Sequence, residues 1–400
     1  MRTVKLVKYL PETGWRPIVL TVDRNDTWMP DRDLLDETSC ARIYRCRDQI
    51  GKYNSKGAVG DEVDSPPRPT PATTYKTKFK ELFKSALVPD KRVGWLLPAV
   101  MLGLKIIKKE NIDIIYATSP PQTPLLVGCF LAILTGKKLV IDYRDAWSSN
   151  TLFQSRYGYH NYINDKLEKF ILRRSALIIT TTTQIENKLL PKTSTPIVTI
   201  PNGFDPEDFV HLTPAPLAEG KVNLVCLGGF SGFRTSRFFV RGVAELDGEI
   251  KKKLAVHIIG QSSPEESALL RGIGDMEINL IGSMTHGEAL RYLLSADLLM
   301  LFIFKEEDSQ AAIPGKVYEY LAAKKPIIAF CDGQSALANL LSQLGVKHIV
   351  TPDNIQEIVG ALSQAVTDSV PLEVDYPCSR FDRKENVHLL AEKLNKMMDR

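Results

Sequence analysis

The sequence contains no cysteine pairs, no long hydrophobic run and no export signal, and each absence excludes a class of protein. Its six cysteines are scattered along 400 residues without a Cys-x-x-Cys pair, which is typical of reduced thiols rather than of a disulfide framework or a zinc site. The longest apolar run, Leu125 to Leu134, is about half as long as the roughly 20 residues of a membrane-spanning helix, and it predicts a buried helix. The scattered cysteines also lead us to expect no structural metal. The N-terminus has no apolar core of signal-peptide length, so we expect a cytoplasmic protein.

Charge is unevenly distributed between the two halves of the chain. Residues 1–200 contain 31 Lys and Arg residues against 20 Asp and Glu residues, whereas residues 201–400 contain 20 against 27. A basic half can bind nucleic acid, anionic lipid or a phosphorylated substrate, or it can be ordinary solvated surface. No recognised nucleic-acid module accompanies the charge, so we expect no nucleic-acid partner.

Short apolar runs alternate with helical patterns throughout, which predicts an α/β fold with mostly parallel sheets. Four hundred residues exceed one ordinary hydrophobic core, so we expect two domains facing a cleft. The predicted strands are Ile18–Val22, Ala41–Cys46, Ile112–Ala117, Leu139–Asp142, Leu177–Thr181 and Ile197–Ile200, followed by Val222–Leu227, Ala255–Ile259, Ile278–Ile281, Leu298–Ile303, Pro326–Phe330 and His348–Val350.

Proline and glycine residues separate the two arrays of strands. The turn 201–203 and the proline-rich stretch 206–216 predict domains 1–204 and 205–379, with a closing helix in 380–400 that packs back on the first domain. A helical pattern, Thr3 to Tyr9, stands where a nucleotide-binding domain normally begins with a buried strand and a Gly-rich turn. We therefore predict that the first domain lacks its first strand, either through a start assigned too late or through truncation, and has an uncovered strand edge. The polar region 23–74 is interpreted as an acceptor-side lid.

The most informative stretch, residues 311–329, has the pattern of a turn, a helix and a strand. Pro314 and Gly315 open the helix, whose free backbone N–H groups favour a bound diphosphate. Lys316 adds a cation, and Glu319 offers a carboxylate to a ribose diol one turn further on. Taken alone, Glu319 can equally be a solvated charge on a helix.

A second turn, residues 227–234, follows a predicted strand and is rich in glycine. Gly229 allows the backbone to approach a ligand, and Arg234 can form two hydrogen bonds to a phosphate. A plain tight connection is the alternative.

Two turns in the first half follow neighbouring predicted strands and are expected at the same crevice. Ser119 and Pro120 belong to one turn, and Arg144 and Asp145 belong to the other. Arg144 and Asp145 are candidates for positioning an acceptor hydroxyl or a leaving phosphate. A simple ion pair at a strand end is the alternative.

Together these motifs resemble the retaining glycosyltransferases of family 4, which have the GT-B architecture of two Rossmann-like domains. Residues 313–329 resemble the donor-site motif of that family, and residues 200–205 resemble its interdomain hinge. Residues 9–15, 91–96, 116–121 and 142–147 are similar to a branch associated with surface polysaccharides. The resemblance spans nearly the whole chain. It implies transfer of a sugar, with retention, from a nucleotide-diphosphate sugar to an acceptor in polysaccharide or glycolipid biosynthesis.

The resemblance also implies residue roles. Glu319 would bind the donor ribose, Lys316 and Arg234 the diphosphate, and the turn at Ser283 the base. The complete implied donor set is Glu319, Lys316, Gly315, Arg234, Gly229 and Ser283, and the acceptor-side set is Ser119, Pro120 and Asp145. Two departures leave the catalytic residue unassigned beyond the candidates Asp145 and Arg144: Ala311 stands where many members have glutamate, and no histidine replaces Thr118 or Ser119.

In the implied mechanism the departing diphosphate helps to take the acceptor proton, so catalysis depends mainly on electrostatic stabilisation of the leaving group. We therefore expect no cofactor and no divalent metal. A nucleotide-sugar epimerase and a non-catalytic nucleotide-sugar-binding descendant are the alternatives.

Residues 75–87 predict an amphipathic helix with Lys76, Lys80 and Lys84 on one flank. Such a helix can lie on an anionic membrane, which would suit a lipid-linked acceptor at the inner face of the membrane. A helix docked on its own domain, with its lysines in water, is the alternative.

Overall fold

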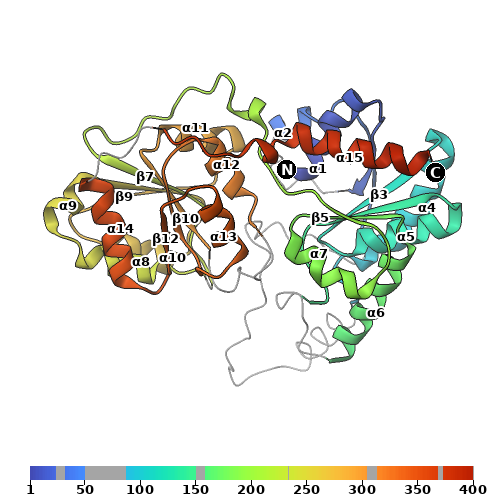
Figure 1. The fold of residues 1–400 in the computed structure, drawn as a ribbon, viewed down its shortest axis with the longest axis horizontal. Helices are drawn as coiled ribbons and strands as arrows, with labels where there is room; N and C mark the ends of the chain where they lie inside the picture. The colour runs from blue at the N-terminus through green and yellow to red at the C-terminus, as the bar shows by residue number, and fades with distance from the viewer. Residues whose placement is uncertain are drawn as a thin grey trace. The chain divides into compact units, whose positions relative to one another are not determined.

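The computed structural model describes residues 1–23, 32–49, 87–149, 158–232, 234–303, 313–367 and 373–399. The chain forms two compact units: unit 1 comprises Met1–Pro201 and Val387–Arg400, and unit 2 comprises Asn202–Asn386. Each unit is built of parallel strands and helices (Figure 1), so the predicted α/β class is confirmed. No helix in the described ranges is long and apolar enough to cross a membrane.

Unit 1 contains two separate parallel sheets among its described residues. The first pairs β1 (Ile18–Val22) with β2 (Arg42–Cys46), and the second has the order β3-β4-β5-β6. The strands of the second sheet are β3 (Ile114–Ser119), β4 (Lys138–Tyr143), β5 (Leu177–Thr180) and β6 (Ile197–Thr199). The register pairs Thr118 with Asp142 and Ser119 with Tyr143, which brings the ends of β3 and β4 together.

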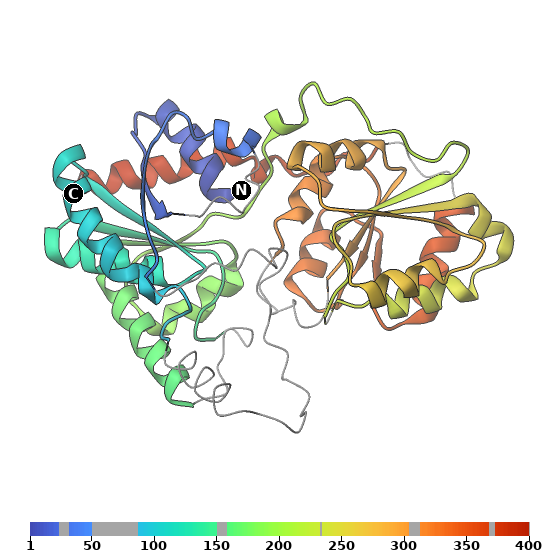
Figure 2. The ribbon, with the colours of Figure 1, turned by 180° about the vertical axis from the view of Figure 1, so that it is seen from behind.

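Helices cover both faces of the second sheet. On one face α1 (Arg2–Tyr9) and α15 (Arg383–Met398) lie side by side, as Figures 1 and 2 show, and Leu6, Leu390 and Leu394 pack with Val140 and Ile179. The other helices among the described residues of unit 1 are η1 (Leu10–Thr13), α2 (Arg32–Asp36), η2 (Val93–Trp95), α4 (Leu96–Glu110), α5 (Thr123–Thr135), α6 (Gly158–Arg174), α7 (Thr183–Leu189) and η4 (Leu190–Lys192).

The prediction that 125–134 forms a buried helix is only half right. The segment lies within α5, and Leu125, Leu126 and Val127 are buried. Leu134 is 60% exposed, and Phe130 and Ile133 are also exposed, because the helix packs on β3 and β4 with one face only. A run that is apolar on all sides does not by itself show which face meets the sheet.

Unit 2 has one six-stranded parallel sheet in the order β12-β11-β10-β7-β8-β9. Its strands are β7 (Val222–Leu227), β8 (Leu254–Ile259), β9 (Glu277–Ile281), β10 (Leu298–Phe302), β11 (Ile327–Phe330) and β12 (His348–Val350). Numbered along the chain within the unit, this is the doubly wound order 3-2-1-4-5-6, in which the strand order reverses between β7 and β10.

Two apolar clusters lie on opposite faces of this sheet. One packs α11 (His286–Ser295), α12 (Lys316–Ala322) and α13 (Ala336–Gln343) on one face, and the other packs α8 (Arg237–Glu245) and α14 (Ile355–Thr367) on the other. The remaining helices of unit 2 are η5 (Pro206–Phe209), α9 (Gly248–Lys253), α10 (Pro264–Arg271) and η6 (Ser379–Phe381). Because all six strands are parallel and covered on both faces, β8, β10 and β11 are buried along their whole length.

Several predictions from the sequence fall outside the described residues. They are the amphipathic segment 75–86, Ala311, and most of the proposed lid at 23–74.

Candidate functional site

The ammonium group of Lys316 lies where the strand order of unit 2 reverses. Its Nζ donates hydrogen bonds to the carbonyl oxygens of Leu227 and Phe302, the last residues of β7 and β10, at 3.2 and 3.3 Å. In open α/β sheets, ligands bind outside the carboxyl ends of the strands at such a reversal. Lys316 therefore brings a positive charge to the position where this fold binds ligands.

A second side chain of α12 holds the helix at the same place. Tyr320, one turn after Lys316, accepts a hydrogen bond from the Leu227 backbone N–H and donates one to the Met300 carbonyl. Residues four apart share one face of a helix. Burial raises the pKa of the nearby Cys226 thiol to about 11, and the positive charge of Lys316 partly opposes this shift. The position of Lys316 is thus fixed by the ends of both central strands.

Glycines allow two loops to touch beside this lysine. A Cβ added to Gly229 would lie 1.9 Å from the Gln261 carbonyl oxygen, and one added to Gly260, where φ is +137°, would lie 2.7 Å from the Gly229 backbone nitrogen. A Cβ added to Gly228 would lie 3.6 Å from the Lys316 ammonium. Gly229 is therefore needed for close packing of the loops after β7 and β8.

Glu319 is held by a histidine that the sequence reasoning missed. The Nε2 atom of His286, the first residue of α11, lies 3.0 Å from Glu319 Oε1, and both side chains are largely buried. Thr285 caps α11 with a reciprocal capping box to Glu288, which fixes the start of that helix. Ser283 is exposed in the turn between β9 and α11.

The other predicted donor residues lie in turns of unit 2. Gly315 is the N-cap residue of α12 and is exposed, and the Arg234 backbone pairs with Ser231 in the turn after β7. The turn after β7 thus carries Gly229 and Arg234, and α12 begins with Lys316. The start of α11 lies beside Glu319 and Ser283.

In unit 1, Arg144 joins the two turns that the sequence placed at one crevice. Its Nε donates to the Ser119 carbonyl at 3.0 Å, its Nη2 donates to the Pro120 carbonyl, and its backbone N–H also donates to Ser119. The Arg144 guanidinium therefore holds the turn after β3 in place. Asp90 fixes the following helix, because its carboxylate accepts hydrogen bonds from the backbone N–H groups of Gln122 and Thr123 at the start of α5.

The carboxylates in this region have different surroundings. Asp142 accepts hydrogen bonds from Arg2 Nε and from the Thr118 hydroxyl through Oδ2, both at 3.1 Å. Its Oδ1 is buried with no hydrogen-bond partner among the described residues, and so is the Ser119 hydroxyl. Burial raises the pKa of the nearby Asp145 carboxyl, while the Arg144 charge opposes the shift and the Asp142 charge adds to it. A carboxylate with raised proton affinity is a better proton acceptor, which suits an acid/base role.

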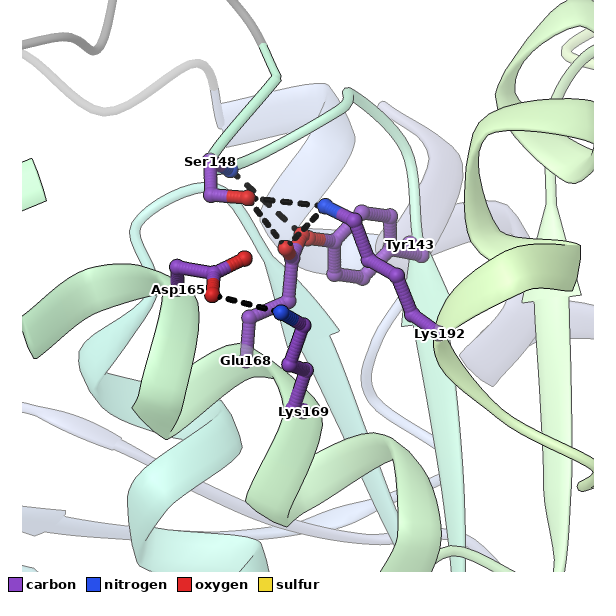
Figure 3. Close-up of polar contacts among 6 residues, drawn as sticks. All are labelled: Tyr143, Ser148, Asp165, Glu168, Lys169 and Lys192. Atoms are coloured by element: carbon purple, nitrogen blue, oxygen red, sulfur yellow. Dashed lines mark hydrogen bonds and ion pairs between the residues drawn. The ribbon is translucent and has the colours of Figure 1, made fainter. Parts of the chain in front are cut away.

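A buried network supports the loop that carries Arg144 and Asp145 (Figure 3). Glu168 of α6, which is 1% exposed, accepts hydrogen bonds from the Tyr143 and Ser148 hydroxyls and pairs with Lys192. Lys192 also donates to the Ser148 hydroxyl at 2.8 Å. Since Tyr143 and Ser148 flank the loop 144–147 on both sides, Glu168 holds both of its ends.

Sequence reasoning missed Arg2, Asp142 and His286. Arg2 and Asp142 lie 140 residues apart, and no local motif links them. Asp142 ends a predicted strand and begins the motif 142–147, but neither pattern assigned it a role. His286 carried one usable signal, its position at the start of a helix directly after the turn assigned to the base.

Both units are therefore α/β folds of parallel strands with polar groups at the carboxyl ends of their strands, and unit 2 has the doubly wound order. The model of Glycosyltransferase Family 4 matches residues 2–208, and the model of Glycosyl transferases group 1 matches residues 221–368. Because the first model covers more than half of the chain, this protein belongs to Glycosyltransferase Family 4. No curated protein matches the chain.

Solved structures agree on the fold. The chain is similar to Anabaena Alr3699/HepE, solved in complex with UDP and glucose, with a TM-score of 0.63 and 15% identity over 99% of this chain and 95% of that one. It is also similar to sucrose-phosphate synthase from Thermosynechococcus elongatus, with a TM-score of 0.60 and 15% identity over 99% and 91% of the two chains. A putative UDP-N-acetylglucosamine 2-epimerase from Listeria monocytogenes gives a TM-score of 0.56 and 12% identity over 96% and 97%. The predicted GT-B fold class is confirmed.

Proposed function

We propose that this glycosyltransferase transfers a sugar, with retention, from a nucleotide-diphosphate sugar bound by unit 2 to an acceptor bound by unit 1. The observation that carries the proposal is the Lys316 ammonium at the strand-order reversal, between the carbonyl oxygens of Leu227 and Phe302. A fixed cation there stabilises the negative charge that develops on a departing diphosphate. We further propose that the reaction needs neither a cofactor nor a divalent metal.

The other donor roles follow from position. Glu319 would accept hydrogen bonds from the donor ribose, Arg234 and Gly315 would lie beside the diphosphate, and the turn at Ser283 would hold the base. The proposal is supported by Gly228, which places no side chain at a position 3.6 Å from the Lys316 ammonium. UDP-glucose is the first donor to test, because the Anabaena neighbour was solved with UDP and glucose.

On the acceptor side, Asp145 is the proposed acid/base residue, supported by the raised pKa of its carboxyl. Ser119 and Pro120 would line the acceptor position, and Arg144 would hold their turn. The proposed acceptor is an intermediate of polysaccharide or glycolipid biosynthesis, and a lipid-linked one would place the protein at the inner face of a membrane.

Replacing Glu319 by alanine is expected to weaken donor binding by roughly 1–3 kcal/mol, because charge-assisted hydrogen bonds to a largely buried ribose are lost. Calorimetric titration with UDP-, GDP- and ADP-sugars measures the difference. The matched control is Glu249→Ala, since Glu249 lies on the surface of the same unit in an exposed pair with Lys252. Equal binding by the wild type and Glu319→Ala, or no binding of any nucleotide sugar by the wild type, contradicts the proposal.

The chemical class is tested by the products. A transferase releases the nucleotide diphosphate when an acceptor is supplied. We expect this release to continue in EDTA, because the proposed reaction needs no divalent metal. Interconversion of two nucleotide sugars without release of the nucleotide would instead identify an epimerase.

Contact with an anionic membrane is supported by the outer surface of unit 1. Leu97 and Met101 on α4 are 64% and 57% exposed, and the exposed apolar residues of α5 lie on the helix packed beside it. The same helix α4 carries the exposed residues Lys105 and Lys108. Apolar side chains beside lysines suit the headgroup region of an anionic bilayer.

We therefore expect the protein to co-sediment at low salt with vesicles rich in phosphatidylglycerol. The double substitution Lys105→Glu and Lys108→Glu should weaken binding by at least about thirtyfold, because each lost cation contributes about 1 kcal/mol and each added carboxylate is repelled by the anionic surface. The control exchanges Lys253 and Lys347, both exposed in unit 2, for glutamate. Vesicle binding that is unchanged by the unit 1 substitutions, or absent at low salt, contradicts the membrane proposal.

A further inference from the structure

Unit 1 contains a cavity of about 1610 Å³ that lies between two strand edges. Every residue of β1 lines it, and so do residues 112–118, which include most of β3. Successive side chains of a strand point to opposite faces, so a wall formed by every residue in a row is the edge of the strand. We call this cavity the slot. Its remaining walls come mainly from α1, α4, α5 and α15.

The two edges that face the slot have no strand partner among the described residues. There, β1 is paired only with β2, and β3 only with β4. The sequence of β1, Ile-Val-Leu-Thr-Val, is that of a buried strand, yet all five residues are only half-buried. By contrast, β8 of unit 2 is buried throughout. Within the described ranges, the slot is therefore lined by two strand edges whose backbone donors and acceptors have no strand partner, and unpaired groups in a mostly apolar cavity cost free energy.

Comparison of the two units shows what is missing from the slot. In unit 2 the central strand is β7, flanked by β8 and β9 on one side and by β10, β11 and β12 on the other. One parallel strand in the slot would join β2-β1 to β3-β4-β5-β6, with the added strand in the place of β7. The order would be that of unit 2 with one further strand, β6, at the edge. Both halves of unit 1 already consist of parallel pairs.

Helix α1 has the position of a crossover helix that follows such a strand. Its first residue, Arg2, bonds Asp142 near the carboxyl end of β4 and the Pro201 carbonyl, and the chain then passes through η1 into β1. Leu6 and Val7 of this helix line the slot, as does Met1. In a β-α-β unit the first strand ends at the carboxyl edge of the sheet, where the helix begins.

We propose that the slot binds an extended apolar polypeptide segment as a strand parallel to β1 and β3, with its carboxyl end beside Met1. The segment is five to six residues long, matching β1 and β3. It is apolar on both faces, because a central strand of a doubly covered parallel sheet is buried on both. Pairing of backbone groups distinguishes this occupant from a lipid, which would fill the volume but leave both rows of N–H and C=O groups unpaired.

The test attaches such a segment to Met1 of the full chain, which fixes its local concentration. One variant carries about six Val and Ile residues and a short Gly-containing turn, a usual strand-to-helix connection. The matched control has proline at two alternate positions of the same segment, since proline cannot donate to the ladder of a sheet. Hydrogen exchange is followed by mass spectrometry in β1 and β3, with β7 to β9 as the internal reference.

We expect amide exchange in β1 and β3 to slow by roughly tenfold or more in the Val/Ile variant relative to the proline control, with no change in unit 2. Equal exchange in the two variants would overturn the proposal. So would a co-purified lipid that both variants retain equally, because the slot would then be filled without a strand.

Discussion

Replacing Lys316 by methionine is expected to lower kcat for sugar transfer by about 10²–10³-fold, with little change in the thermal stability of unit 2. Removal of a single preorganised group that stabilises developing negative charge typically has an effect of this size. Methionine keeps most of the length of the side chain and removes only the charge and its hydrogen bonds to Leu227 and Phe302. Tyr320 continues to bond the end of β7 at Leu227 and the middle of β10 at Met300 in this variant.

The measurement is the release of nucleotide diphosphate at saturating donor, with the donor Kd determined separately. Lys347→Met is the matched control, because Lys347 is exposed in the same unit. A fall in kcat much larger than the change in donor affinity indicates stabilisation of the transition state. A normal kcat in Lys316→Met would remove the observation on which the proposed function depends.

The strands could be predicted closely because buried parallel strands are short continuous apolar runs. Val222–Leu227 and His348–Val350 have the predicted bounds. The departures have local causes. The sequence predicted that one strand would start at Pro326, but β11 starts at Ile327 because proline has no N–H for the ladder. A second strand was predicted to end at Ala117, but β3 extends to Ser119, because Thr118 and Ser119 pair with β4 through their backbones in spite of their polar side chains.

The candidate site could be predicted only where its residues lie in one local motif. Gly315, Lys316 and Glu319 are neighbours in sequence, and their positions around α12 follow from helical geometry. The partners that fix them are distant: Lys316 bonds residues 89 and 14 positions away, and His286 lies 33 positions before Glu319. The Arg144 guanidinium likewise bonds a turn that is 24 to 25 residues earlier. Such contacts depend on which strands are neighbours, and a single sequence does not contain that information.

Replacing Glu168 by alanine is expected to lower the free energy of unfolding of unit 1 by about 3–5 kcal/mol, because it leaves one partner of a buried ion pair uncompensated. Lys192 would lose its carboxylate, and the buried Tyr143 hydroxyl would lose its acceptor. Burial and the Glu168 charge hold the pKa of Tyr143 well above its ordinary value, so this hydroxyl stays a neutral donor. Glu168→Gln should be less harmful, since its amide oxygen can still accept the Tyr143 hydrogen bond.

The matched control comes from the same helix and is drawn beside it in Figure 3. Asp165 pairs with Lys169 at 2.7 Å, but both side chains are about one-third exposed. An exposed pair four residues apart on a helix contributes only about 0.3–0.5 kcal/mol, so Asp165→Ala should behave almost like the wild type.

Urea unfolding followed by tryptophan fluorescence measures this difference in unit 1 alone, because all four tryptophans precede residue 148. Trp147 is 2% exposed and lies next to Ser148, so its emission reports directly on the loop that Glu168 holds. The expected result is a lower midpoint with an unchanged slope for Glu168→Ala, and a midpoint near that of the wild type for Asp165→Ala. Similar midpoints for the two alanine variants would mean that the buried network does not stabilise unit 1. The positioning of Arg144 and Asp145 would then have to come from the contacts of Arg144 with Ser119, Pro120 and Thr181.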